Sequence, residues 1–270
     1  MEDPRFRSDL YRGTAQYYDR FRPGYPALLI ADLKIRTGLT GTGRLLDLGC
    51  GTGHIAFALK DCFDEVWAID QEPDMVAFCQ GKARAGAASN IRCIQSTAED
   101  LSMPDCTCKL NGIGNAFHRF DRARVASRCL RWLEPGGHLA LLWGGSPWRG
   151  PDPWQQTLSS LMDRWMATLD VQDRVPAGHE KVQRQRPDLL VLTEAGFDLI
   201  GSWEFLQDHW WTPEDLVGFM LSTSVLSPEV LAGRVQEFEE DLGRTIAPYQ
   251  VGGVVHQTMR FAYELAQVPS

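Results

Sequence analysis

Residues 44–53 read RLLDLGCGTG, a short apolar run followed directly by a glycine-rich turn. A helical pattern starts at residue 54, and a second apolar run occupies residues 65–70. A strand, a glycine-rich turn and a helix in this order form the place where an open α/β sheet binds a nucleotide-like ligand. The stretch therefore predicts an α/β fold with a ligand site at the end of its first strand.

The second apolar run ends at Asp70, which lies at the spacing expected for a carboxylate that reaches a ribose diol from the neighbouring strand. A glycine-rich turn alone is equally well a structural loop, but the turn and the acid together indicate a nucleotide site. A dinucleotide-binding turn needs one more glycine, three residues after the second. His54 occupies that position, so the spacing disfavours a dinucleotide.

Apolar runs and helical patterns alternate along the first half of the chain, which is typical of βαβ units and a parallel sheet. Five strands are expected by residue 145, and two more near residues 197–205 and 254–263, although the last run also fits a helix. Helices are expected before the first strand, over residues 9–21 and 27–37. The expected parts are a helical lid (1–37), a ligand-binding core (38–145), an insertion (146–196) and a C-terminal completion of the sheet (197–270).

The composition excludes several classes of protein. With 44% apolar and 23% charged residues, the chain is expected to fold as an ordinary globular enzyme. Its net charge of −8 repels a phosphate backbone, which argues against nucleic acid as a partner. The charged start and the lack of a long apolar run predict a cytoplasmic protein without a membrane partner. Seven cysteines without metal-knuckle spacing predict reduced thiols and no metal site.

Five motifs occur in a specific order along the chain. The lead YYDRFRPGYP (17–26) precedes DLGCGTG (47–53), and AEDL (98–101), FHRFD (117–121) and LEPGG (133–137) follow. In this order they resemble the class I S-adenosylmethionine-dependent methyltransferases, from about residue 15 to residue 143. The lead and the FHRFD segment are similar to a subgroup of bacterial small-molecule enzymes, including antibiotic-tailoring N-methyltransferases such as those of lincosamide biosynthesis.

This resemblance implies a Rossmann-like, seven-stranded, mostly parallel sheet with helices on both faces, and S-adenosyl-L-methionine as the cofactor. Asp70 would hold the ribose hydroxyls, Ala98 and Glu99 would contact the adenine, and Arg22 would pair with the cofactor's carboxylate or remain solvated. The full set of expected cofactor-binding residues is Tyr18, Arg22, Asp47, Gly49, Gly51, Gly53, Asp70, Gln71, Met75, Ala98, Glu99 and Asn115.

Three residues are expected to act near the transferred methyl group, each with an alternative role. His118 is the candidate base for a hydroxyl acceptor, or it packs locally after the fourth strand. Phe117 lines the methyl-donor pocket or belongs to the core. Tyr17 lies over the sulfonium as part of a lid without a core role, or it packs as part of an amphipathic helix.

The expected reaction is methyl transfer to an amine nitrogen of a small-molecule acceptor, a secondary metabolite and in particular an antibiotic. Two signatures of DNA base methylation, an acid or Asn before Pro-Pro-aromatic and a Pro-Cys nucleophile, are missing. The alternatives are an O-methyltransferase that uses His118 as base, a nicotinamide-dependent oxidoreductase and a non-catalytic cofactor sensor. The sequence is compatible with a homo-oligomer.

Overall fold

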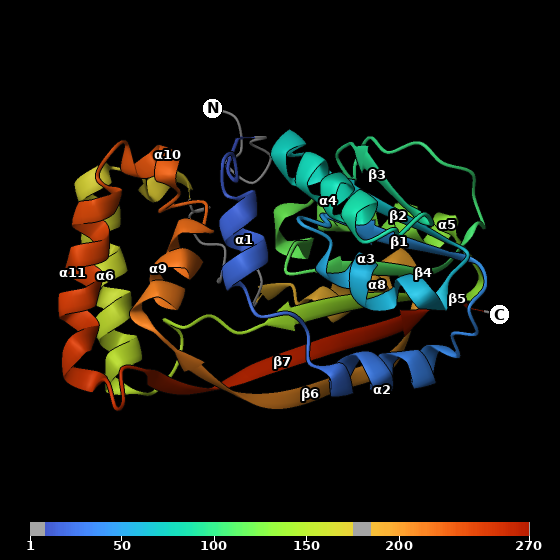
Figure 1. Cartoon of the computed structure of the whole chain (residues 1–270). Helices are drawn as coiled ribbons and strands as arrows, with labels where there is room; N and C mark the ends of the chain where they lie inside the picture. The colour runs from blue at the N-terminus through green and yellow to red at the C-terminus, as the bar shows by residue number, and fades with distance from the viewer. Residues whose placement is uncertain (1–8, 175–184, 270) are drawn as a thin grey trace.

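The computed structural model describes residues 9–174 and 185–269, and its centre is a seven-stranded sheet (Figure 1). The strand order is β3-β2-β1-β4-β5-β7-β6, and only β7 runs antiparallel to its neighbours. The Rossmann-like, mostly parallel sheet expected from the sequence is confirmed. The strands are β1 (Arg44–Leu48), β2 (Glu65–Asp70), β3 (Ile91–Gln95), β4 (Cys108–Gly114), β5 (Leu133–Gly144), β6 (Asp198–Trp211) and β7 (Val255–Gln267).

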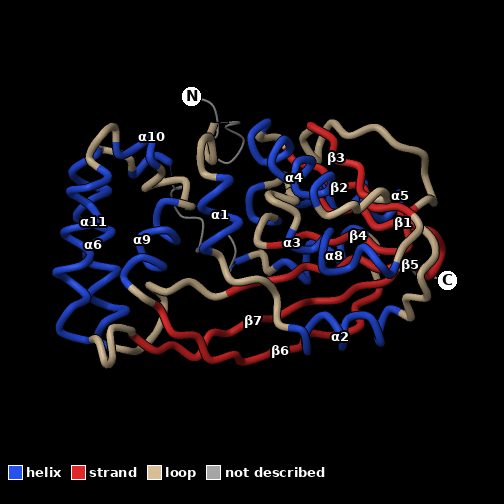
Figure 2. Tube along the Cα trace, in the orientation of Figure 1, coloured by secondary structure: helices blue, strands red, loops and turns tan. Residues whose placement is uncertain are grey.

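Helices cover both faces of the sheet (Figure 2). In β1, Leu45 packs into a core cluster with α2 and α3, whereas Leu46 and Leu48 pack on the opposite face with α5 and α8. No helix among the described residues combines the length and the apolar character needed to cross a membrane. The helices are α1 (Ala15–Phe21), α2 (Ala27–Thr37), α3 (His54–Leu59), α4 (Pro73–Ala85), α5 (Arg122–Trp132), α6 (Pro153–Leu169), α8 (Asp188–Ala195), α9 (Pro213–Leu221), α10 (Pro228–Leu231) and α11 (Val235–Ile246), with 3-10 turns η2 (Lys60–Cys62), η3 (Phe117–Arg119), η4 (Gln172–Arg174) and η5 (Ala247–Tyr249).

The last two strands are longer than the sequence predicts. β6 and β7 pair along their whole lengths, from Asp198 opposite Gln267 to Trp211 opposite Val255. β5 pairs only with the final part of β7, starting at Phe261, so the rest of the hairpin extends beyond the parallel sheet. Buried and exposed residues alternate along β7, a period of two that decides against a helix in this segment.

A helical cluster formed by α6, α9, α10 and α11 lies beyond the outer part of this hairpin (Figure 1). Trp165 of α6 meets Phe238 of α11 edge to face at 5.4 Å, and its indole nitrogen donates a 3.0 Å hydrogen bond to Asp241. Thr212 caps α9 by accepting a hydrogen bond from the Asp215 backbone N–H, as the sequence predicts. The cluster therefore joins helices from both sides of β6 in the sequence.

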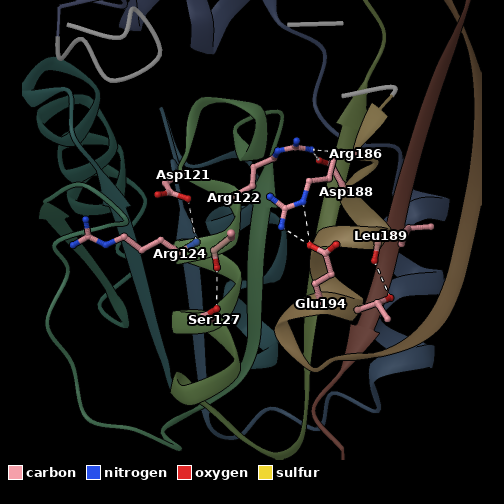
Figure 3. Close-up of polar contacts among 10 residues, drawn as sticks. Asp121, Arg122, Arg124, Ser127, Arg186, Asp188, Leu189 and Glu194 are labelled. Atoms are coloured by element: carbon pink, nitrogen blue, oxygen red, sulfur yellow. Dashed lines mark hydrogen bonds and ion pairs between the residues drawn. The ribbon is translucent and has the colours of Figure 1, made fainter. Parts of the chain in front are cut away.

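The segment 146–196, expected as one insertion, contributes to two separate places. Its helix α6 belongs to the helical cluster, whereas α8 packs against α5 on one face of the sheet. Arg122 at the start of α5 forms a buried ion pair with Asp188 of α8, with 2.6 Å between Nη1 and Oδ1 (Figure 3). Residues 175–184 of the expected insertion lie outside the described residues.

The N-terminal segment is helical over a shorter range than expected. Residues 9–13 form turns, because Gly13 has a φ of +71° and the backbone N–H groups there bind side chains of α4 and the loop before it. The Tyr11 N–H donates to Glu72 at 3.1 Å, and the Gly13 N–H donates to Asp74 at 2.9 Å. The segment is thereby fixed over the carboxyl end of β2. Residues 1–8 of the expected lid lie outside the described residues.

Helix α1 packs between α4 and α9 and has a role in the core. Lys82 of α4 pairs with Asp19 at 2.6 Å. On the other side the Phe21 ring fills the space beside Gly218 of α9, where an added Cβ would lie 2.2 Å from that ring. The expectation that this segment has no core role is therefore wrong, because α9 depends on Phe21 for its packing.

Candidate active site

The glycine-rich turn lies at the carboxyl end of β1, which pairs with β2 on one side and with β4 on the other. The chain order of the sheet reverses here, and such a switch point leaves a crevice at the carboxyl ends of the strands. Gly53 is the N-cap residue of α3, so the turn leads directly into that helix. The topology therefore puts the turn at the ligand-binding edge that its sequence predicts.

A cavity of about 410 Å³, here named the main cavity, opens at this edge of the sheet. Its walls come from the ends of β1, β2 and β4, the loop after β3, and the N-terminal segment. Most of the predicted cofactor-binding residues line it, namely Tyr18, Gly49, Gly51, Asp70, Gln71, Met75, Ala98, Glu99 and Asn115.

Two glycines of the turn have different physical roles. Gly51 has a φ of +53° and lines the main cavity, and an added Cβ would lie 3.6 Å from the Tyr18 ring. Gly53 has a φ of +90°, and an added Cβ would lie 2.8 Å from the Phe57 ring and 2.9 Å from the Cys79 sulfur. Gly51 thus leaves room for a ligand, whereas Gly53 allows the close packing of α3 against α4.

Asp70 is buried at the end of β2 and its carboxylate is held in place by the backbone. Its Oδ2 accepts a 2.8 Å hydrogen bond from the Gly51 N–H, and its Oδ1 accepts one of 2.9 Å from the Glu72 N–H. Burial raises the pKa of Asp70, and the backbone donors only partly offset this. The carboxylate therefore links the glycine-rich turn to the start of α4 at the wall of the main cavity.

A smaller hollow of about 30 Å³, here named the side hollow, adjoins the main cavity and is lined by Asp47, Arg22 and His54. The Asp47 Oδ2 accepts a 3.0 Å hydrogen bond from the Ala56 N–H, whereas its buried Oδ1 has no hydrogen-bond partner in the described part of the chain. Burial raises the pKa of Asp47 to about 7. An ammonium group placed here would satisfy this oxygen and favour its charged form.

Arg22 lies at the same hollow and is fixed by three neighbours. Its Nε donates a 2.9 Å hydrogen bond to the Ser222 hydroxyl, and its guanidinium lies 4.4 Å from the Tyr18 ring centroid and 4.8 Å from that of Phe219. A guanidinium between two rings is pre-oriented for a carboxylate. Asp47 and Arg22 therefore match the ammonium and carboxylate of an amino-acid group.

None of the three predicted catalytic residues lines the main cavity or the side hollow. Phe117 is fully buried in the core cluster that contains α5, and Tyr17 stacks on Phe21 at 6.4 Å. His118 stacks on Trp143, with 6.4 Å between ring centroids. The structure thus matches the packing alternatives for these side chains, and their chemical roles stay predictions.

Other residues line the main cavity although the sequence did not single them out. Leu10 reaches it from the N-terminal segment, Glu72 from the start of α4, and Arg119 and Phe120 from the 3-10 turn η3. The FHRFD segment predicts that this turn lies near the ligand, but it does not predict which of its side chains faces the cavity. The orientation of the turn selects that side chain. Burial raises the pKa of Glu72 to about 7.

The chain matches known methyltransferases. Residues 45–137 match the methyltransferase domain family. Over 189 residues, 68% of this chain and 72% of the relative, the chain is 30% identical to an uncharacterized methyltransferase of Mycobacterium tuberculosis. It is also similar to the malonyl-[acyl-carrier protein] O-methyltransferase of Methylococcus capsulatus, with 32% identity over 127 residues. This match covers 46% of this chain and 42% of that protein.

Solved structures share the fold. The YcgJ protein of Bacillus subtilis superposes with a TM-score of 0.55 at 16% identity, over 91% of this chain and 100% of that one. A methyltransferase of Aquifex aeolicus gives a TM-score of 0.52 at 15% identity, over 94% and 98%. The fold and the site define a methyltransferase of class I. The chain belongs to the class I S-adenosylmethionine-dependent methyltransferase family, which decides against the nicotinamide alternative.

The residues that line the main cavity and the side hollow fit the family's cofactor, S-adenosyl-L-methionine. Asp70 would hold its ribose, Asp47 its ammonium and Arg22 its carboxylate. Two observations support this fit: the Asp47 Oδ1 has no hydrogen-bond partner among the described residues, and Gly51 has no side chain to block the cavity. When bound, the cofactor supplies an electrophilic methyl group on a sulfonium. The protein's contribution to such a displacement is mainly to orient the two reactants and exclude water.

The affinity for S-adenosylmethionine is expected to rise with pH between about pH 6 and about pH 8, because the cofactor's ammonium favours ionised Asp47 and binding then releases its proton. Calorimetry in buffers of different ionisation enthalpy measures this release. Asp47→Asn should bind more weakly and lack this part of the dependence. A proton release that is identical in Asp47→Asn would assign it to another group.

Tyr18 and its neighbour Tyr17 provide a matched pair of variants. Tyr18 lines both hollows, so Tyr18→Ala is expected to weaken cofactor binding by roughly 10-fold through loss of a ring face near the sulfonium. Tyr17→Ala should mainly lower the melting temperature, because that ring packs on Phe21. Equal losses of affinity in the two variants would contradict this assignment.

Proposed function

We propose that the protein transfers the methyl group of S-adenosylmethionine to an amine nitrogen of a small organic acceptor, a secondary metabolite. The choice of nitrogen is supported by two observations. No histidine occurs among the described residues that line the main cavity, and Glu72, the acid there with a pKa of about 7, already accepts a hydrogen bond from the Tyr11 N–H. The one histidine that the sequence offers as a base, His118, stacks on Trp143 instead. A neutral amine needs alignment but no base, whereas a hydroxyl acceptor requires one.

The cover of the main cavity supports a small acceptor. Leu10 and Tyr11 form part of its wall, and Arg174 ties this segment to the turn between α9 and α10. The Arg174 Nε donates to the Ser224 carbonyl at 2.6 Å, and the Arg174 Nη2 donates to the Leu10 carbonyl at 3.3 Å. A cavity closed from two sides favours a compact molecule over a polymer.

A carboxyl oxygen is the second candidate acceptor. The relative from Methylococcus capsulatus is named as an O-methyltransferase, and a carboxylate oxygen, like a neutral amine, needs no base. The secondary-metabolite assignment, and an antibiotic in particular, draws on the resemblance to antibiotic-tailoring enzymes. Homo-oligomer formation and the exclusion of nucleic acid and membrane partners stay predictions.

Methyl transfer from S-adenosylmethionine carrying a ¹³C-labelled methyl group tests the proposal. The enzyme is incubated with a panel of small amines, alcohols and carboxylic acids, and the labelled product is read by NMR. A ¹³C methyl shift typical of C–N bonds supports the proposal, whereas a shift typical of methyl esters supports the second candidate. A protein that binds the cofactor but labels no member of such a panel would favour the sensor alternative.

A further inference from the structure

Arg119 brings a cation into the main cavity without an anionic partner. It is the last residue of η3 and lines the cavity. Its Nη2 lies 3.3 Å from the Ser224 hydroxyl, whereas its Nε and Nη1 are buried and have no hydrogen-bond partner among the described residues. No ion pair to Arg119 occurs within residues 9–174 and 185–269. Arg119 is half-buried, and besides Ser224 its guanidinium faces the Tyr11 ring, 5.8 Å from the ring centroid. A cation on a cavity wall without an anionic neighbour attracts anionic ligands.

The carboxylates on the cavity wall already have other donors. Glu99 accepts a 2.8 Å hydrogen bond from the Asp121 N–H, and Asp121 accepts one of 3.2 Å from the Arg124 N–H. Asp70 accepts the two backbone N–H groups described above, and Glu72 that of Tyr11. Asp100, the fifth acid of the wall, accepts from the Thr97 hydroxyl at 2.9 Å. All five acids therefore have hydrogen-bond donors other than Arg119.

The surroundings of Arg119 are positive in a protein of negative net charge. Arg22 binds the Ser222 hydroxyl and Arg174 the Ser224 carbonyl, so three arginines converge on one turn. Burial raises the pKa of Tyr11, but the charges of Arg119 and Arg22 and a hydrogen bond with Arg119 outweigh burial and lower the pKa overall. This wall of the main cavity therefore favours an anion.

The position of Arg119 separates it from the site assigned to the cofactor's amino-acid group. Asp47 and Arg22 line the side hollow, whereas Arg119 lines only the main cavity. Arg119 therefore lies outside the hollow assigned to the cofactor's ammonium and carboxylate.

We propose that Arg119 binds an anionic oxygen group, a carboxylate or a phosphate, of the methyl acceptor. The inference rests on the proposed methyl transfer to a small molecule and narrows its substrate class to amines that also carry an acidic group. A guanidinium offers N–H donors in a planar fork that matches such oxyanions. An oxyanion in the main cavity would pair with this guanidinium and neutralise its charge.

The test is calorimetric titration, in saturating S-adenosylhomocysteine, with benzoate, phenyl phosphate and the neutral analogue benzamide. We expect an anion to bind better than benzamide, and the tighter of the two anions identifies carboxylate or phosphate. Arg119→Gln should weaken anion binding roughly 10- to 100-fold. Arg131→Gln, which removes an exposed arginine from α5, is the matched control and should change nothing.

Three outcomes would overturn the proposal. They are equal binding of benzamide and benzoate, unchanged anion binding in Arg119→Gln, or loss of S-adenosylhomocysteine binding in that variant, which would assign Arg119 to the cofactor. Arg119→Gln should also melt at about the same temperature, because Arg119 is half-buried and forms no ion pair with the described residues. The ¹³C experiment decides the proposed function separately, since an O-methylated product would end the amine proposal and leave the anion preference standing.

Discussion

Replacement of Gly51 by valine is expected to abolish S-adenosylmethionine binding and to leave the protein folded. A Cβ at this position would point to Tyr18 at 3.6 Å, so the branched side chain would occupy the part of the main cavity beside the turn. The backbone there has a φ of +53°, which a β-branched residue adopts only with strain. Calorimetry measures the binding, and circular dichroism measures the fold.

Gly41→Val is the matched control for the strain at Gly51. Gly41 also has a positive φ, of +88°, but an added Cβ there meets nothing within 4 Å, and the residue is exposed and away from both hollows. The Gly41 variant should lose stability and keep its affinity for the cofactor. If Gly51→Val binds S-adenosylmethionine normally, the glycine-rich turn has only a structural role.

Replacement of Asp70 by alanine is expected to weaken cofactor binding by about 1.5–3 kcal/mol, the scale of hydrogen bonds to a charged group. The carboxylate would accept hydrogen bonds from the ribose hydroxyls and also holds the Gly51 N–H at the turn. Both contributions disappear in the variant. The dissociation constant from calorimetry gives the loss directly.

Two further variants separate the contributions of Asp70. Asp70→Asn keeps the size of the side chain and one acceptor oxygen but removes the charge, so it should lose less affinity than the alanine variant. Asp64→Ala is the control, because Asp64 also accepts a loop hydrogen bond, from the Gly43 N–H at 2.8 Å, but is exposed and does not line the cavity. An unchanged dissociation constant in Asp70→Ala would remove this residue from the site.

The helical cluster shows a limit of reading domains from sequence position. α6 precedes β6 and α11 follows it, yet Trp165 and Phe238 pack together. The amphipathic pattern of each helix indicates that it buries one face, but not against which partner. The long β6–β7 hairpin carries the chain out to the helical cluster and back. This connection becomes visible only when the pairing of β6 and β7 along their whole lengths is known.

The sheet, the glycine-rich turn and the family could be predicted from the sequence, because they depend on local constraints. Apolar runs of strand length, the closely spaced glycines of the turn, and an acid at the end of the next strand are all read directly along the chain. The tertiary structure decided which side chains meet the ligand beyond the turn. In η3, Phe117 enters the core, His118 stacks on Trp143 and Arg119 lines the cavity. Successive residues of a 3-10 turn point about 120° apart, so adjacency in sequence does not specify direction, and packing of the turn against its neighbours selects the residue that faces the cavity.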